Sequence, residues 1–395
     1  MNIADFFQPV SHSQGLFSDK PHPLSLLNVA GIHNHPDRFP DLENMDIAIL
    51  GVLDDRNAPA NKGCAAGPDQ IRQHLYHLFQ GPFKAKIADL GNIQAGEKVT
   101  DTYVAVKAVI AELLEKRITP VVIGGGQDIT YAAYQAYESL GQIINMVSVD
   151  AQFDLGQEKN EAIHHKNYLG HILTHQPNYL FHFANIGYQT YFVDQDAIAL
   201  MEQLYFDVYR LGVLRNHLEE VEPIVRNADM LSFDLSAIRQ SDAPGKSPGS
   251  PNGLFGEEAC QIARYAGLSD KISCVGFYEM NPSLDHNGQT AHLVAQMIWY
   301  FIDGYYHRTN DLPDKQTKDS RNFIKYVVSI KDFQNKIIFY KSKISDRWWM
   351  EVPCPERLKQ KYDRHFLVAC SYKDYQEACQ NEIPEKWWQV YQKFV

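Results

Sequence analysis

The sequence predicts an α/β protein in which a parallel β-sheet is covered by helices on both faces. Eight short runs rich in Val, Ile, Phe and Tyr alternate with segments of helical spacing along most of the chain. Alternation of this kind is typical of a parallel sheet between two helical layers. Several of the runs are apolar at nearly every position, as expected for strands that are buried on both faces.

The expected strands and helices follow from these two patterns. The apolar runs predict strands at residues 46–53, 86–90, 120–123, 144–150, 180–188, 206–211, 230–235 and 272–277. Val106, Val109 and Leu113 fall on one side of a helix, and similar spacing predicts helices at residues 103–116, 131–140, 197–204, 219–228, 257–268 and 291–305. Because ligands of such sheets bind beyond the carboxyl ends of the strands, residues that directly follow a strand are the first candidates for a site.

The pattern changes after residue 307. A polar stretch that contains proline reads as a linker, and two alternating runs after it predict a β-hairpin. The runs lie at 324–330 and 336–343, the hairpin connection at 332–335, a third expected strand at 347–352 and a helical tail at 372–394. Trp348, Trp349, Trp387 and Trp388 in this part suit a packed core or an interface equally.

These patterns divide the chain into four parts. We expect an N-terminal extension, an α/β domain, a linker and a small β-plus-α extension, at residues 1–45, 46–307, 308–320 and 321–395 respectively.

The composition excludes several classes of protein. The 395 residues include 37 Lys+Arg and 48 Asp+Glu, which gives a formal charge of −11 and argues against a nucleic-acid-binding protein, since such a protein needs a basic face. No apolar run reaches the roughly 18 residues of a membrane span, and the start of the chain lacks a secretory pattern. The 6 Cys have no metal-site spacing and are expected to be reduced, so we expect a cytoplasmic protein without a membrane partner.

Acidic residues gather where three of the predicted strands end. Asp150 and Asp154 stand at and after one strand, Asp234 lies at the end of another, and Gln127-Asp128 follows the three glycines after a third. Any one of these groups alone is more often a turn or helix cap. Because three such clusters share one sheet, they predict an oxygen-rich pocket that suits a divalent cation.

Six separate motifs, in this order, resemble the ureohydrolase superfamily of arginase, agmatinase and formimidoylglutamase. They cover roughly residues 45–305 and lie at 51–75 (a substrate-side loop and a Gly-Pro-x-x-Ile-Arg helix start), 124–128 (GGGQD), 150–156 (DAQFDLG), 232–236 (SFDLS), 252–258 (NGLFGEE) and 279–284 (EMNPSL). The stretch DAQFDLG is most similar to the formimidoylglutamase version. The resemblance implies a three-layer α/β/α fold with a mostly parallel eight-stranded sheet, hydrolysis of formimino or guanidino C–N bonds in small linear amidines, and a homo-oligomer.

The resemblance also implies a metal centre, and this sequence departs from it. Members of the superfamily hold two Mn²⁺ ions with two His and four Asp, and the bound water becomes the nucleophile. The matching positions here are Gln127, Asp150, Gln152, Asp154, Asp234 and Ser236, so three of the six ligands remain and both imidazoles are lost. We expect at most one weakened site, formed by Asp150, Asp154, Asp234 and Gln127, for Mn²⁺, Mg²⁺ or Ca²⁺. Asp150 and Asp154 are also the expected catalytic groups.

The sequence leaves open two sources of replacement metal ligands and one residue that could contact the substrate. Relocated metal ligands are available from Asp128 or from the residues His164, His165, His171 and His175. Glu258 matches the family's acidic residue that faces the cationic group of the substrate, and a helix-capping role is the equally good alternative.

If no ion binds, the three carboxylates must be protonated, hydrogen-bonded or paired with a cation. Arg239 and Lys246, in the loop after Ser236, are the candidates for that cation, and they also suit a solvated loop.

Two functions therefore compete. The first is a divergent metal-dependent hydrolase of a formimino or guanidino compound. The second is a catalytically inactive homologue that binds a small molecule or a protein partner. A third class, an unrelated nucleotide-binding protein, is disfavoured because Gly124–Gly126 lacks the spacing of a phosphate-binding loop.

Overall fold

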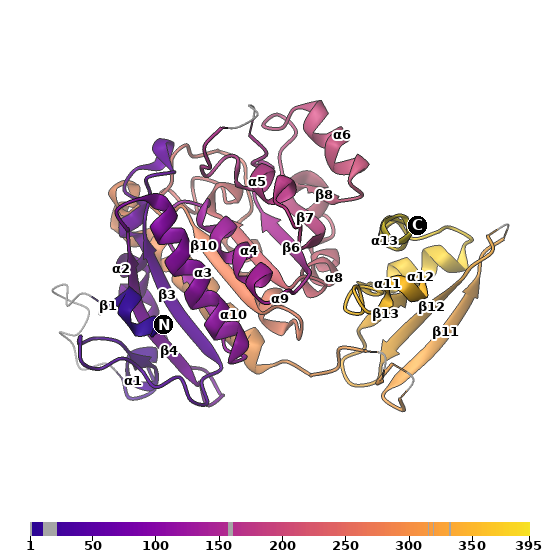
Figure 1. Cartoon of the computed structure of the whole chain (residues 1–395), viewed down its shortest axis with the longest axis horizontal. Helices are drawn as coiled ribbons and strands as arrows, with labels where there is room; N and C mark the ends of the chain where they lie inside the picture. Colours follow the sequence, from indigo (N-terminus) through magenta and orange to yellow (C-terminus); the bar gives the residue numbers. More distant parts are fainter. Residues whose placement is uncertain (1, 11–21, 157–160, 315, 319, 332) are drawn as a thin grey trace.

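The computed structural model describes residues 2–10, 22–156, 161–314, 316–318, 320–331 and 333–395. A ten-stranded sheet with helices on both faces forms the larger part, and a four-stranded sheet with its own helices forms the smaller part (Figure 1). The strands are β1 (Phe7–Gln8), β2 (Gly31–Ile32), β3 (Ile47–Leu53), β4 (Ile87–Gln94), β5 (Thr119–Ile123), β6 (Ile144–Val149), β7 (Leu180–Tyr188), β8 (Asp207–Arg210), β9 (Met230–Asp234), β10 (Cys274–Tyr278), β11 (Phe323–Ser329), β12 (Lys336–Ser342), β13 (Trp348–Glu351) and β14 (Leu367–Cys370). The helices are α1 (Leu26–Val29), α2 (Gly67–Leu75), α3 (Val99–Glu115), α4 (Ile129–Ser139), α5 (Tyr168–Thr174), α6 (Gln195–Gln203), α7 (Leu211–Leu214), α8 (Val221–Arg226), α9 (Gly256–Leu268), α10 (Gln289–Tyr306), α11 (Glu356–Lys359), α12 (Tyr372–Cys379) and α13 (Glu385–Phe394).

The large sheet confirms the predicted fold class. Its order is β1-β4-β3-β5-β10-β9-β6-β7-β8, with β2 beside β4, and the pairs from β3 to β10 are parallel while β1 runs antiparallel to β4. All eight predicted strands are present as β3 to β10. The sequence did not predict β1 and β2, because a two-residue strand shows no periodicity.

Two apolar clusters, one on each face of the sheet, form the core of the larger part. One cluster includes residues of α3, α4 and α5, and the other includes residues of α2, α8, α9 and α10. In the second layer α9 and α10 approach closely at Gly267 and Gly304. A Cβ atom on Gly267 would lie 2.1 Å from the carbonyl oxygen of Phe301, so a larger residue would push the two helices apart.

The smaller part is an antiparallel sheet in the order β11-β12-β13-β14 with α12 and α13 beside it. The predicted hairpin and third strand are confirmed as β11, β12 and β13, although residue 332 of the connection lies outside the described residues. The predicted helical tail forms two helices, since α13 starts directly after Pro384. The strand β14 was not predicted. We call β11 to α13 (residues 323–394) the C-terminal unit.

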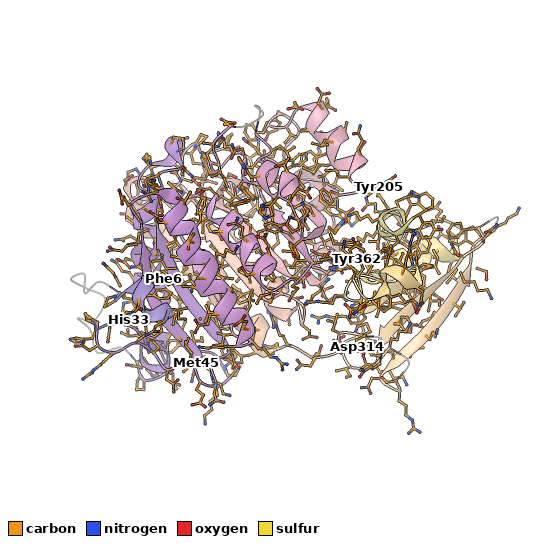
Figure 2. All side chains as sticks on the ribbon, viewed as in Figure 1. Phe6, His33, Met45, Tyr205, Asp314 and Tyr362 are labelled. Atoms are coloured by element: carbon orange, nitrogen blue, oxygen red, sulfur yellow. The ribbon has the colours of Figure 1, made fainter. Side chains whose placement is uncertain are left out.

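The C-terminal unit packs where strands of the large sheet begin. Arg226, at the end of α8, donates hydrogen bonds to the carbonyl oxygens of Trp348 (3.2 Å) and Cys370 (3.2 Å). Arg364 of the unit forms an ion pair with the buried Asp229, directly before β9. Side chains fill the space between the two parts, with Tyr205 and Tyr362 on facing sides (Figure 2). The unit therefore contacts the amino ends of β6, β7 and β9.

Lys393 of α13 lies in this contact and gives it a pH dependence. Its ammonium donates to the carbonyl oxygen of Phe181 (3.1 Å) and lies 2.8 Å from Nδ1 of His182. Burial lowers the pKa of Lys393 to about 7, although the nearby Asp207 acts to raise it. The unfolded chain therefore binds more protons than the folded chain above pH 7, and the stability contributed by this residue rises with pH.

We expect the free energy of unfolding to rise between pH 7 and 9.5 by at most about 1.4 kcal/mol per pH unit from this residue. Urea unfolding at several pH values checks this against Lys393→Met, which should lose that part of the rise. Lys361→Met, at an exposed position, should keep it. An equal slope in all three proteins would contradict the assignment.

Among the described residues, no helix has both the length and the apolar character needed to cross a membrane.

Candidate functional site

Three buried aspartates meet at the carboxyl ends of β6 and β9. Asp150 directly follows β6, Asp234 is the last residue of β9, and Asp154 lies in the loop after β6. Carboxylate oxygens of all three lie within 4.8 Å of one another. The structure thus brings together the three aspartates that the sequence singled out, and we call them the aspartate cluster.

Hydrogen bonds from the chain itself reach the aspartate cluster. Ser236 donates from its hydroxyl to Oδ1 of Asp150 (3.0 Å), and the same oxygen accepts from the N–H of Gln152 (2.9 Å). Burial raises the pKa of both Asp150 and Asp154, and the repulsion between neighbouring carboxylates adds to the effect. The two carboxyl groups therefore hold a proton more readily than ordinary aspartates.

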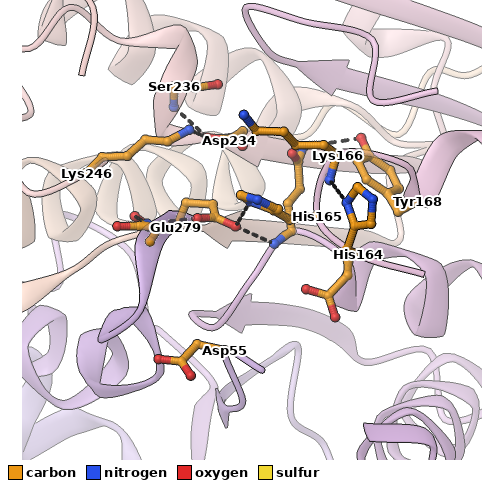
Figure 3. A network of polar contacts seen from close by, with 12 residues as sticks. Asp55, His164, His165, Lys166, Tyr168, Asp234, Ser236, Lys246 and Glu279 are labelled. Atoms are coloured by element: carbon orange, nitrogen blue, oxygen red, sulfur yellow. Dashed lines mark hydrogen bonds and ion pairs between the residues drawn. The ribbon is translucent and has the colours of Figure 1, made fainter. Parts of the chain in front are cut away.

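Lys246 supplies a positive charge to the aspartate cluster. Its ammonium forms an ion pair with Oδ1 of Asp234, and both side chains are about 7% exposed (Figure 3). Burial acts to lower the pKa of Lys246, but the negative charges of Asp234, Glu279 and Asp150 outweigh it and raise the pKa. The group is therefore charged at neutral pH. Of the two candidate cations that the sequence indicated, Lys246 is the one that pairs with the aspartate cluster.

Arg239, the other candidate, lies elsewhere. Its guanidinium is 2.8 Å from Oδ1 of Asp242 and stacks over the ring of Phe255 at 4.1 Å. It therefore stabilises the loop before α9.

Gln127 lies between β5 and α4 and is fully buried. Its amide nitrogen donates to the hydroxyls of Tyr168 (3.2 Å) and Ser232 (3.3 Å). In the part of the chain that the structure describes, its Oε1 atom has no hydrogen-bond partner. Asp128, the next residue, accepts a hydrogen bond from the hydroxyl of Tyr103 (2.5 Å), which holds it toward α3.

Glu279 is a further buried carboxylate beside the three aspartates, and the sequence indicated it only as part of the motif at 279–284. Its Oε1 accepts from the backbone N–H of Gln127 (3.0 Å) and lies 2.9 Å from Nδ1 of His165, while Oε2 accepts from Asn61 (2.8 Å). Burial acts to raise the pKa of Glu279, but His165 and Lys246 outweigh it and lower the pKa. The signal in the sequence that could have identified Glu279 as a site residue is its position directly after the buried strand β10.

The four histidines after the aspartate cluster do not gather on it in the described contacts. Only His165 enters the crevice, where it pairs with Glu279. The other three are held elsewhere: His164 beside Glu161 (2.9 Å), His171 on the carbonyl oxygen of Glu161 (3.1 Å) and His175 beside Glu138 (3.2 Å). The structure gives no support to relocated histidine ligands.

Glu258 lies at the start of α9 and makes the capping contact that the sequence offered as one of its two roles. Its Oε2 accepts from the backbone N–H of Phe255 (2.7 Å), and Arg215 lies 3.9 Å from its other oxygen. Its contact with a cationic substrate stays a prediction. The first turn of a helix attracts a carboxylate because free N–H groups point toward it.

The residues do not fit a two-ion metal centre. Such a centre needs more donor atoms than three carboxylates, and imidazoles are its usual nitrogen ligands. Here the Ser236 hydroxyl donates a hydrogen bond to Oδ1 of Asp150, and the Lys246 ammonium forms an ion pair with Oδ1 of Asp234. Both contacts use electron pairs that a metal ion would need.

A mostly parallel sheet between two helical layers, with carboxylates at the carboxyl ends of its strands, defines an α/β protein whose ligand site lies at that edge. The family model for the Arginase family matches residues 45–303. The chain therefore belongs to the arginase family.

Formimidoylglutamases are among its relatives. The protein of this name from Staphylococcus aureus strain MSSA476 is 28% identical over 286 residues, which cover 67% of this chain and 90% of the relative. Two solved structures share the fold. Bacillus subtilis formimidoylglutamase has a TM-score of 0.66 at 17% identity and covers 76% of this chain and 97% of its own. Trypanosoma cruzi formiminoglutamase with Mn²⁺ has a TM-score of 0.63 at 19% identity, and the match covers 72% of this chain and 99% of the other. The predicted resemblance is thus confirmed.

Proposed function

We propose that this arginase-family protein does not hydrolyse amidines through a metal-bound water and acts instead as a binding or interaction protein. The observation that carries the proposal is the hydrogen bonding of Asp150, whose Oδ1 already receives the Ser236 hydroxyl and the Gln152 N–H. The side chain of Ser236 stands where the resemblance implies a carboxylate ligand. A donor in place of an acceptor stabilises the crevice without an ion and removes a ligand from it.

The ligand class that we propose for the crevice is a small linear amidine or guanidino compound. The names of the relatives support this class. The buried carboxylates of the aspartate cluster and Glu279 also favour a cationic group over an anion. The expected homo-oligomer, the cytoplasmic location and the division of the chain at residues 45, 307 and 320 stay predictions.

A second candidate is a weak single-ion hydrolase, and one observation favours it. In the described part of the chain, Oδ2 of Asp150 and Oε1 of Gln127 are buried without a hydrogen-bond partner. Oxygen atoms of this kind are ligands for Mn²⁺, Mg²⁺ or Ca²⁺. An ion there would involve Asp150, Asp154, Asp234 and Gln127, and it would supply Lewis-acid activation of water, with Asp150 and Asp154 as the catalytic groups.

Elemental mass spectrometry and a turnover assay distinguish these functions. We expect the purified protein to contain less than about 0.1 ion per chain, before and after incubation with 1 mM MnCl₂ and desalting, because Lys246 and Ser236 engage the aspartates. We also expect no release of formamide from formimidoylglutamate and no release of urea from arginine. The Staphylococcus aureus formimidoylglutamase, assayed in parallel, is the positive control for the first substrate. One ion per chain with turnover would support the second candidate and refute the first.

A further inference from the structure

We propose that Lys246 is a built-in cation that takes the place of a divalent ion in the aspartate cluster, and that removing its ammonium opens a site for one divalent cation. The inference rests on the proposed function in one respect, namely that the native chain holds no ion. The new element is the identity of the residue, Lys246, whose charge prevents an ion from binding.

The position of the ammonium supports this inference. It reaches the aspartate cluster from the loop after β9 and binds Oδ1 of Asp234, the oxygen that also accepts the backbone N–H of Ser236 (2.5 Å). Figure 3 shows the side chain of Lys246 extended toward Asp234. Because the three carboxylates lie within 4.8 Å of one another, an ion among them would stand close to this ammonium. Like charges at that separation in a buried site exclude each other.

The residue directly before Lys246 is held by hydrogen bonds at both its N–H and its carbonyl oxygen. The N–H of Gly245 donates to Oγ1 of Thr290 (2.7 Å), and its carbonyl oxygen accepts from the N–H of Asn281 (2.8 Å). A Cβ atom on Gly245 would lie 2.8 Å from Cβ of Asp285, so this close approach excludes larger residues. Lys246 is therefore fixed in the crevice and is not a solvated loop residue.

The atoms left behind by the lysine suit an ion. Within the described residues, Oδ2 of Asp150 is buried and has no hydrogen-bond partner. Without the ammonium, Oδ1 of Asp234 would lose its ion-pair partner, and three buried carboxylates would repel one another. A hard divalent cation relieves that repulsion and accepts oxygen ligands from all three. The three carboxylates are thus suited to bind a cation, and in the native chain the ammonium of Lys246 is that cation.

The test compares ion binding by the wild type, Lys246→Met and Lys62→Met. Methionine keeps the length of the side chain and removes the charge. Lys62 is the matched control because it also pairs with an aspartate, Asp55, at 3.3 Å, but is 52% exposed. Isothermal titration with MnCl₂, MgCl₂ and CaCl₂, followed by elemental analysis, gives the affinity and the number of ions.

We expect Lys246→Met to bind one ion per chain at least tenfold more tightly than the wild type, and Lys62→Met to behave as the wild type does. The added substitution Asp150→Asn should abolish the new site. Equal ion binding by the wild type and Lys246→Met would overturn the inference, and so would a folded Lys246→Met that binds none of the three ions.

The experiment still decides the inference if Lys246→Met does not fold in the absence of an ion. In that case, refolding in 1 mM MnCl₂, MgCl₂ or CaCl₂ should restore the far-UV circular dichroism spectrum, and Lys246→Ala should do the same. Failure of both variants with every ion would overturn the inference. The turnover assay on the wild type remains separate: hydrolysis by an ion-free wild type refutes the proposed function alone, whereas a bound ion without hydrolysis refutes the role of Lys246 alone.

Discussion

Replacement of Arg72 by methionine is expected to lower the free energy of unfolding by about 3–5 kcal/mol, since it leaves a buried carboxylate without its cation. Arg72 is fully buried in α2 and donates to both oxygens of Asp89 in β4, at 2.8 and 2.9 Å. Its Nη1 atom also donates to Oδ1 of Asn92 (2.6 Å). One side chain therefore joins a helix to the sheet.

Urea unfolding followed by far-UV circular dichroism measures this loss. Arg38→Met, at an exposed position, is the control and should change the free energy by less than about 0.5 kcal/mol. The double variant Arg72→Met/Asp89→Asn should regain part of the stability, because it no longer buries an unpaired charge. A loss below 1 kcal/mol in Arg72→Met would show that the ion pair contributes little.

Trp387→Ala is expected to destabilise the C-terminal unit by about 3–5 kcal/mol, because it leaves a large cavity. Trp387 is fully buried, stacks on Tyr391 with the ring centres 5.0 Å apart, and donates from Nε1 to the carbonyl oxygen of Glu351 (2.9 Å). It thus ties α13 to β13.

The adjacent Trp388 provides a matched control, since it is 41% exposed. Trp388→Ala should cost less than about 1 kcal/mol. Thermal unfolding, together with proteolysis of the C-terminal unit, compares the two variants. If both variants unfold at the same temperature, Trp387 has no special role in the core of the unit.

The fold could be predicted from the sequence because long buried strands carry their own pattern. The apolar runs that became β3 to β10 alternate with amphipathic helices, and this order alone defines the class. Two of the strands that escaped prediction, β1 and β2, have two residues each, too few for a period to show, and the four-residue β14 was also missed.

The sequence predicted which residues form the candidate site better than it predicted the contacts between them. Asp150, Asp154 and Asp234 were found because parallel strands end at the same edge of a sheet. Lys246 could be named as a candidate cation, yet its choice over Arg239 depends on Thr290 and Asn281, which hold the loop from a distant part of the chain. Contacts between segments so far apart leave no local pattern in the sequence. For Glu258 the sequence left a cap and a substrate contact open, and the structure shows the hydrogen bond of the cap.

Strand β9 carries a buried aspartate at each of its two extremities. Asp229, directly before the strand, meets Arg364 of the C-terminal unit, and Asp234, its last residue, meets Lys246. The five residues of the strand span about 17 Å. Two ion pairs are therefore joined by a single five-residue segment of main chain, one pair at each of its ends. One of them anchors the segment to the C-terminal unit, and the other anchors it to the loop that carries Lys246.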